Sequence, residues 1–328
     1  MIIFWASVLA SSILLYVLLD GFDLGVGILY GFAREDRVRG AMMSAVAPVW
    51  DGNETWLIVS GVVLWGAFPI VYATLFSAFY LPLSFMLAGL ILRGVAFEFR
   101  NKARRLPWVW DFAFSGGSLL AAFMQGTMVG ALAKGLQLVN GNYAGSEFSW
   151  LSPFAVLCGV GLCLGYALLG ACWLVRKSTG DVQTTSFRLI PVLSLASLAV
   201  LAVVFRFALS EHLQVLGRWL ERPYLFAFPL IGIVAGIALA LSVRRRRERA
   251  PFYLVGVTFA AAFGTFAVSF WPYMIPFSIT VDEAAAPHSS LAFMFWGEGL
   301  FVLPLMLVYT VISYRVFRGK ASSNSPLY

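Results

Sequence analysis

The sequence predicts an all-α polytopic membrane protein, and two observations carry that prediction. Of its 328 residues, 60% are hydrophobic, 16% are aromatic and only 12% are charged, which is far from the balance of a water-soluble globular domain. The apolar residues also gather in runs of about 20, the length of a helix that crosses the hydrocarbon core of a bilayer. We therefore expect one integral membrane domain over residues 1–328.

Nine apolar runs are found, and each is predicted to form one transmembrane helix. They cover residues 2–32, 50–72, 76–100, 110–136, 152–176, 187–209, 223–243, 251–272 and 290–316. Because a longer loop at 137–151 divides the first eight, we expect two four-helix bundles, 1–136 and 152–272, with the ninth helix, 290–316, at the periphery. The first run is too long for the apolar region of a signal peptide, so this helix is expected to be retained.

Basic residues mark alternate loops between the predicted helices. The first, third, fifth and seventh loops are strongly basic, whereas the eighth holds Asp282 and Glu283 without Lys or Arg. The positive-inside rule therefore puts the amino terminus outside and the carboxyl terminus in the cytoplasm. The net charge of +7 reports this topology, and nucleic-acid binding is not implied. The first loop contains Arg34, Arg37 and Arg39, and the seventh contains Arg244, Arg245, Arg246, Arg247 and Arg249.

Four carboxylates stand near the first two helices. Asp20 and Asp23 lie three residues apart inside the first apolar run, roughly 18 Å and 14 Å from its cytoplasmic end at a rise of about 1.5 Å per residue. An ionisable group at such depth is costly and marks a functional site. Asp51 and Glu54 open the second helix, where the positive end of the helix dipole favours acids. The four would step inward from the cytoplasmic surface, which suggests a route for protons or cations.

Each acid also has a structural explanation. Asp51 and Glu54 could merely cap the second helix and match its dipole. Asp20 and Asp23 could instead form structural bonds, for example with Arg93 inside the third helix.

Other ionisable residues give weaker signals. Arg93 and Arg100 are predicted to share a face of the third helix, with Glu98 pointing elsewhere. Glu298, in the ninth helix and closer to the outer face, is a minor candidate that could face a cavity or a partner subunit.

The sequence offers little for a metal or haem. The two histidines, His212 and His288, both map to outer loops, with no second His, Cys or Met arranged to complete a haem or copper site. The three cysteines, Cys158, Cys163 and Cys172, lack metal-ligand spacing and are interpreted as small buried apolar residues. We therefore expect no metal and no haem ligand in this chain.

Four segments carry a resemblance to a known family. In order along essentially the whole chain, they resemble subunit II of the cytochrome bd-type quinol oxidases, the CydB family, and a further stretch, Ala-Ala-Ala-Pro-His-Ser-Ser-Leu291, is similar to the cyanide-insensitive branch. The segments are Asp20-Gly-Phe-Asp-Leu-Gly-Val-Gly27, Ala47-Pro-Val-Trp-Asp-Gly-Asn-Glu-Thr-Trp-Leu57, Leu92-Arg-Gly-Val-Ala-Phe-Glu-Phe-Arg100, and Trp271-Pro followed by Ser278-Ile-Thr-Val-Asp-Glu-Ala-Ala-Ala286.

The resemblance implies a heterodimeric terminal oxidase of the bacterial plasma (inner) membrane that oxidises quinol and reduces O2 to water. Subunit I, which is CydA-like, would carry two b-type haems and a d-type or third b-type haem, and subunit II none. A small single-helix accessory subunit and a structural quinone occur in some members. The family fold, two four-helix bundles with a peripheral ninth helix, agrees with the division expected above.

The resemblance also implies roles for individual residues. The family's proton pathway corresponds to Asp51 with Asp20 and Asp23, and Glu54, whose position varies within the family, is added as a candidate. The residues predicted to support this pathway belong to the same motifs: Trp50, Asn53, Arg93, Glu98 and Arg100.

Three hypotheses of function follow. The first is a haem-free oxidase subunit that stabilises subunit I and supplies protons from the cytoplasm to the site of O2 reduction. The second is a proton-coupled secondary transporter, which would need a substrate site between broken helices near the midplane. The third is a purely structural membrane subunit whose acids only bind helices together.

Overall fold

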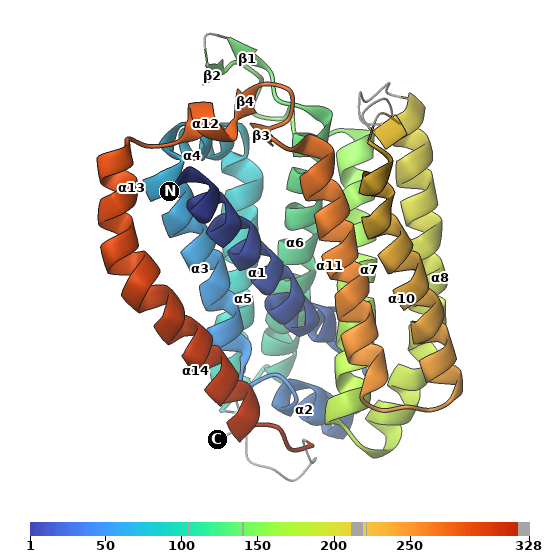
Figure 1. Cartoon of the computed structure of the whole chain (residues 1–328). Coiled ribbons are helices and arrows are strands. Elements are labelled where there is room, and N and C mark those ends of the chain that lie inside the picture. The colour runs from blue at the N-terminus through green and yellow to red at the C-terminus, as the bar shows by residue number, and fades with distance from the viewer. Residues whose placement is uncertain (101, 104, 140, 211–218, 221, 321–328) are drawn as a thin grey trace.

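The computed structural model is almost entirely helical, and its long helices run side by side (Figure 1). It describes residues 1–100, 102–103, 105–139, 141–210, 219–220 and 222–320. The helices are α1 (Ile2–Tyr30), α2 (Asp36–Ser44), α3 (Trp50–Ala67), α4 (Pro69–Ala78), α5 (Tyr80–Phe99), α6 (Pro107–Lys134), α7 (Pro153–Lys177), α8 (Gly180–Ser210), α10 (Ala227–Arg244), α11 (Ala250–Phe270), α12 (Val281–Ala284), α13 (His288–Met294) and α14 (Leu303–Val316).

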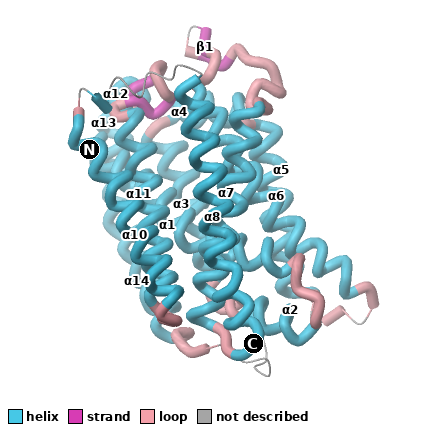
Figure 2. Tube along the Cα trace, turned by 90° about the vertical axis from the view of Figure 1, so that its right-hand side faces the viewer, coloured by secondary structure: helices cyan, strands magenta, loops and turns pink. Residues whose placement is uncertain are grey.

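Short irregular elements connect these helices. A 3-10 turn, Pro223–Phe226, precedes α10, and a π-helical stretch, Phe295–Val302, joins α13 to α14 without a break. Two antiparallel hairpins pair β1 (Leu138–Val139) with β2 (Asn142–Tyr143) and β3 (Tyr273–Ile275) with β4 (Ile279–Thr280). Figures 1 and 2 place these strands at one end of the bundle and α2 at the other.

Eight helices of the described chain are long and apolar enough to cross a membrane. This confirms an all-α polytopic membrane protein. They correspond to eight of the nine predicted runs and cover Ile2–Tyr30, Tyr80–Phe99, Pro107–Lys134, Pro153–Lys177, Gly180–Phe207, Pro223–Arg244, Ala250–Phe270 and His288–Val316.

The ninth predicted run, 50–72, is not among these eight, and it differs from the prediction in shape. Helix α3 ends at Ala67, and α4 starts directly after Phe68 with Pro69 at its first position. Proline lacks the N–H that would continue the helical hydrogen bonding, but it suits the first turn of a new helix. The run is therefore broken inside its predicted length.

Helix α1 lies in the middle of the bundle, in contact with α3, α6, α7 and α11 (Figure 1). Every residue from Asp20 to Tyr30 is buried. Glycines allow the closest approach, because a Cβ on Gly25 would lie 1.7 Å from the carbonyl oxygen of Tyr166, and a Cβ on Gly170 would lie 2.5 Å from the backbone of Gly25. Helices α1 and α7 therefore meet backbone to backbone, as small residues permit in membrane proteins.

Candidate functional site: a cluster of acids around Arg93

The site begins with two acids on the buried half of α1. Asp20 and Asp23 are both 0% exposed. Their spacing of three residues places them on one face of the helix. The structure thus puts the pair that the sequence singled out in the interior of the bundle.

Arg93 of α5 is the cation of this site, and it is also 0% exposed. Its Nη1 donates to Oδ1 of Asp20 at 2.7 Å, and its Nη2 donates to Oε2 of Glu54 on α3 at 2.7 Å. One guanidinium therefore links a carboxylate buried on α1 to a carboxylate that is 26% exposed on α3. The pairing of Asp20 with Arg93, considered above as a structural explanation, is present.

Asp23 is held by an amide. Asn53 Nδ2 donates to Oδ2 of Asp23 at 2.7 Å and, at 3.3 Å, to the carbonyl oxygen of Leu19. The Oδ1 atom of Asn53 accepts a hydrogen bond of 2.9 Å from the hydroxyl of Tyr314 on α14. The sequence grouped Asn53 with the site through its motif, but nothing in the pattern indicated that Tyr314, 261 residues later, would complete the contact.

The cluster is incompletely satisfied. Within the part of the chain that the structure describes, three of its buried atoms have no hydrogen-bond partner: Oδ2 of Asp20, Oδ1 of Asp23 and Nε of Arg93. Buried polar atoms are bonded in the great majority of cases, so such exceptions require an explanation. Arg93 bonds only two of the three carboxylates, Asp20 and Glu54, and the third, Asp23, is bonded by Asn53 instead.

A pocket of about 330 Å³ between α3 and α5 gives access to the cluster. Asp51 and Glu54 both line it, and Asp51 is exposed. The indole of Trp50 stacks on Phe97 with ring centroids 4.8 Å apart and forms part of the wall. Glu54 therefore faces the pocket on one side and Arg93 on the other, whereas Asp51 remains at the pocket and is not bonded to the buried acids.

A further polar group, missed in the sequence, lies beyond Asp20. Tyr16 lies beside this acid, and its hydroxyl accepts a hydrogen bond of 2.6 Å from Nε2 of Gln125 on α6. The Oε1 atom of Gln125 accepts one of 2.9 Å from the hydroxyl of Tyr166 on α7. The polar connection thus extends from α3 through α5 and α1 to α6 and α7. A buried Gln in an apolar run was the signal that could have indicated it.

Three predicted residues do not join the cluster. Glu98 is exposed and pairs with Lys102 at 3.2 Å. Glu298 lies in the π-helical stretch at a partly exposed position and makes no hydrogen bond or ion pair with the residues of the cluster. Arg100 was expected on the same face as Arg93, but it belongs to a separate set of contacts.

That separate set surrounds Asp111, near the start of α6. Its Oδ2 accepts from Arg39 at 2.7 Å, and its Oδ1 accepts from Arg100 at 2.9 Å and from the hydroxyl of Tyr30. Arg100 also pairs with Asp36 of α2 at 2.8 Å. Asp111 escaped the sequence analysis, although an acid in the first turns of an apolar run that follows a basic loop was the available signal.

Among the described residues, no three of the His, Cys, Asp and Glu side chains are grouped to hold a metal ion. His288 is exposed at the start of α13, and His212 lies outside the described residues. The three cysteines, all on α7, are free.

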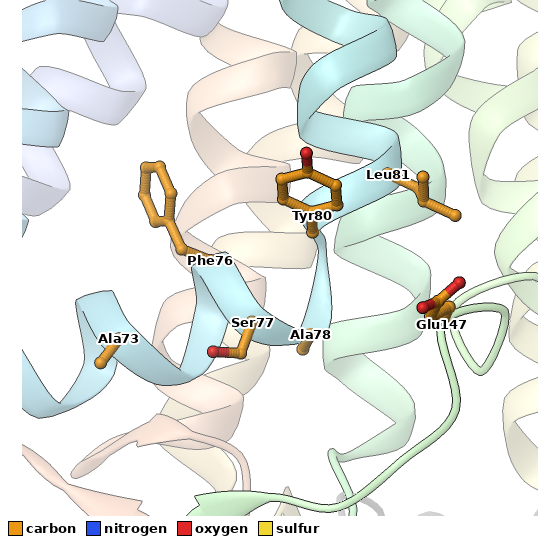
Figure 3. A pocket seen from close by; sticks show the side chains of 7 residues that line it. All are labelled: Ala73, Phe76, Ser77, Ala78, Tyr80, Leu81 and Glu147. Carbon is orange, nitrogen blue, oxygen red and sulfur yellow. The ribbon is translucent and has the colours of Figure 1, made fainter.

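A second pocket, of about 600 Å³, lies at the corner between α4 and α5 (Figure 3). It is lined by Ala73, Phe76, Ser77, Ala78, Tyr80, Leu81 and Glu147. None of these residues belongs to the acid cluster.

Comparison with known proteins decides the family. Residues 1–317 match the family described as cytochrome bd terminal oxidase subunit II. The chain belongs to this family. The match confirms the resemblance seen in the four sequence motifs. This subunit II is accordingly one component of a cytochrome bd-type quinol oxidase, an oxidoreductase complex that contains haem and a partner subunit I. It is a multi-pass protein of the bacterial inner membrane.

Relatives of known name agree along nearly the whole chain. The "Probable cytochrome oxidase subunit 2" of Haemophilus influenzae is 30% identical over 93% of this chain and 91% of its own length. The "Cytochrome bd-I ubiquinol oxidase subunit 2" of Escherichia coli K12 is 28% identical over 96% and 94%. The "Cytochrome bd ubiquinol oxidase subunit 2" of Bacillus subtilis is 28% identical over 98% and 97%.

The fold is also found in a solved structure. The bd oxidase from Geobacillus thermodenitrificans superposes with a TM-score of 0.79 over 96% of this chain and 98% of the matched chain. Sequence identity is 16%, so this likeness concerns the fold alone.

Proposed function

We propose that this subunit carries protons from the cytoplasm toward the site of O2 reduction in subunit I. The observation that carries the proposal is the position of Glu54. Its carboxylate lines a pocket that opens between α3 and α5, and it is also bonded to Arg93, which is bonded to the buried Asp20. A continuous set of polar side chains therefore joins an accessible surface to the interior of the membrane domain.

The roles of the side chains follow from their chemistry. Reduction of O2 to water consumes protons, and carboxylates can bind and release them, whereas a guanidinium stays charged and does not exchange its protons on this path. Arg93 therefore holds the negative charge of the acids in place. Asp51 and Glu54 would take up protons at the pocket, and the unpartnered oxygens of Asp20 and Asp23 would receive them.

The haems are proposed to reside in subunit I, which would bind two b-type haems and a d-type or third b-type haem and oxidise quinol. The names of two relatives support ubiquinol as the quinol. A structural quinone and a small single-helix accessory subunit remain proposals from the family resemblance.

The finer topology is also proposed. With 18 residues and a rise of about 1.5 Å each, α3 would be roughly 27 Å long, enough to add a ninth crossing to the eight helices found. The two bundles would then be 1–136 and 152–272, with His288–Val316 outside them. The basic loops support a cytoplasmic carboxyl terminus and an outer amino terminus.

The test is made in the assembled two-subunit oxidase. Asp20→Asn, Asp23→Asn, Asp51→Asn and Glu54→Gln should each lower oxygen consumption at normal haem content, by at least about tenfold for the two buried acids, because proton transfer groups commonly contribute more than that. Glu98→Gln is the matched control, since Glu98 is a surface acid paired with Lys102.

A purely structural role is the second candidate, and the buried pair of Asp20 with Arg93 favours it. Unchanged oxygen consumption in all four variants, with normal haem content, would establish that role and end the proposal of a proton path. The transporter hypothesis has no support from the relatives, whose names describe oxidase subunits.

A further inference from the structure

The last helix reaches the acid cluster from outside. No residue of α14 is fully buried, yet Tyr314 near its end is partly buried and bonds Asn53, which is 1% exposed. Through Asn53 the hydroxyl of Tyr314 is only two hydrogen bonds from Asp23. In Figure 1, α14 runs along the edge of the bundle, whereas α1, which carries Asp23, occupies its middle.

The surroundings of Asn53 fix the orientation of its amide. Its nitrogen faces two acceptors, the carboxylate of Asp23 and the carbonyl oxygen of Leu19, and its oxygen faces a hydroxyl donor, that of Tyr314. The reversed amide would set its oxygen against two acceptors. Without the hydroxyl, the oxygen of Asn53 would be buried with no donor, and only the two acceptors of its nitrogen would hold the amide in this orientation.

Two contacts place α14 against the start of α3. The ring of Tyr309 lies so close to Gly52 that a Cβ there would be 2.8 Å from it. One turn further along α3, the indole nitrogen of Trp56 donates to Oγ1 of Thr310 at 3.3 Å. Together with the bond between Tyr314 and Asn53, these contacts set the height of α14 relative to α3.

The segment after α14 is tied to the rest of the chain as well. Lys177, at the end of α7 and 8% exposed, donates to the carbonyl oxygens of Phe317 and Gly319, the latter at 2.9 Å. Lys320 pairs with Glu248 at 2.7 Å. The end of α14 is therefore held on both sides of Tyr314, as a positioning role requires.

We propose that Tyr314 is a positioning residue that orients the amide of Asn53 and thereby holds Asp23. The inference deepens the proposed proton path and rests on it only for its effect on turnover. The hydrogen bonds themselves can be tested whether or not Asp23 carries protons.

The experiment uses the complete membrane-bound oxidase and measures how fast a hydrophobic carbodiimide labels Asp23, by mass spectrometry of the peptide. Tyr314→Phe removes only the hydroxyl, and it should raise the rate of labelling by about three- to tenfold, the factor in equilibrium that one buried hydrogen bond commonly supports. Tyr309→Phe, on the same helix, should leave the rate at the wild-type value. If the proton path holds, Tyr314→Phe should also lower kcat for oxygen consumption with KM for quinol unchanged.

Two further measurements separate positioning from general loosening. Asn53→Ala should raise the labelling of Asp23 by itself, and adding Tyr314→Phe to it should change nothing more, because the hydroxyl acts through the amide. Labelling of Glu298 in the same samples should stay constant. The proposal is overturned if Tyr314→Phe does not raise the labelling of Asp23, if the two substitutions are additive, or if Glu298 becomes equally reactive.

Discussion

Two clusters in this protein join carboxylates to arginines, and they are built differently. Around Asp111, two arginines and the hydroxyl of Tyr30 occupy both carboxylate oxygens. Around Arg93, the two terminal nitrogens of one guanidinium bond different acids, Asp20 and Glu54. Asp20 and Asp23 each keep one oxygen without a partner among the described residues. Both carboxylate oxygens of the first cluster have hydrogen-bond donors, whereas the second cluster keeps carboxylate oxygens that are free to accept a proton.

The difference teaches how to separate a structural ion pair from a candidate path. The Asp111 cluster joins α2 to the ends of α1, α5 and α6, so its contacts are explained by the connection they make. The residues around Arg93 are more deeply buried, meet a pocket through Glu54, and include atoms with no hydrogen-bond partner in the described part of the chain. Satisfaction of the hydrogen bonds, and not the presence of charge, distinguishes the two.

Removal of the central cation should have the largest effect. Arg93→Gln leaves the buried carboxylate of Asp20 and the partly exposed carboxylate of Glu54 without their cation, and loss of one partner from a buried ion pair costs about 3–5 kcal/mol. The purified complex should unfold at a clearly lower temperature, and its haem content should fall. Arg93→Lys keeps the charge but cannot bond Asp20 and Glu54 through two separate terminal nitrogens. Its unfolding temperature should therefore lie between those of the wild type and Arg93→Gln. A Gln variant as stable as the wild type would show that the acids do not depend on Arg93.

The satisfied cluster should respond in stability alone. Asp111→Asn weakens three hydrogen bonds, two of them to arginines, and should cost about 1–3 kcal/mol in thermal unfolding. Oxygen consumption per haem should stay at the wild-type value, in contrast to Asp20→Asn. A loss of turnover in Asp111→Asn at full haem content would erase the distinction between the two clusters.

The exposed ion pair between Lys320 and Glu248 should have the smallest effect on stability. The hydrogen bond from Lys320 holds the pKa of Glu248 below its ordinary value, so the pair stabilises the protein above the ordinary glutamate range and this contribution is lost as the pH falls through the lowered pKa. Glu248→Gln should change the unfolding free energy at neutral pH by less than about 1 kcal/mol, and high salt should abolish the change. The difference in unfolding midpoint between variant and wild type should vanish at acidic pH. A difference that grows instead would mean that Glu248 is not paired as described.

Local patterns predicted much of the site. Asp20 and Asp23 could be placed in the interior because a polar residue inside a long apolar run has few other locations. Asp51 and Glu54 could be placed at the beginning of the next helix by their position before an apolar run. Which of the two reaches Arg93 could not be predicted, because that depends on how α3 is rotated about its axis against α5.

Contacts between distant segments were the part that sequence reasoning missed. Tyr314 looks like any aromatic residue at the end of a membrane helix, and Gln125 like an isolated polar residue in α6. Their roles arise only when α14 and α6 pack against α3 and α1. Helical spacing predicted that Arg100 shares a face of its helix with Arg93, but it could not show that Arg100 bonds Asp111.

By itself, the sequence determined the membrane class, eight of the helices and the family, because these follow from composition, run length and short motifs that are local along the chain. Only the tertiary structure decided which acid meets which cation and which polar atoms are left unpaired. A hydrogen bond requires two groups to meet within about 3 Å, and the rotation and height of each packed helix set that distance.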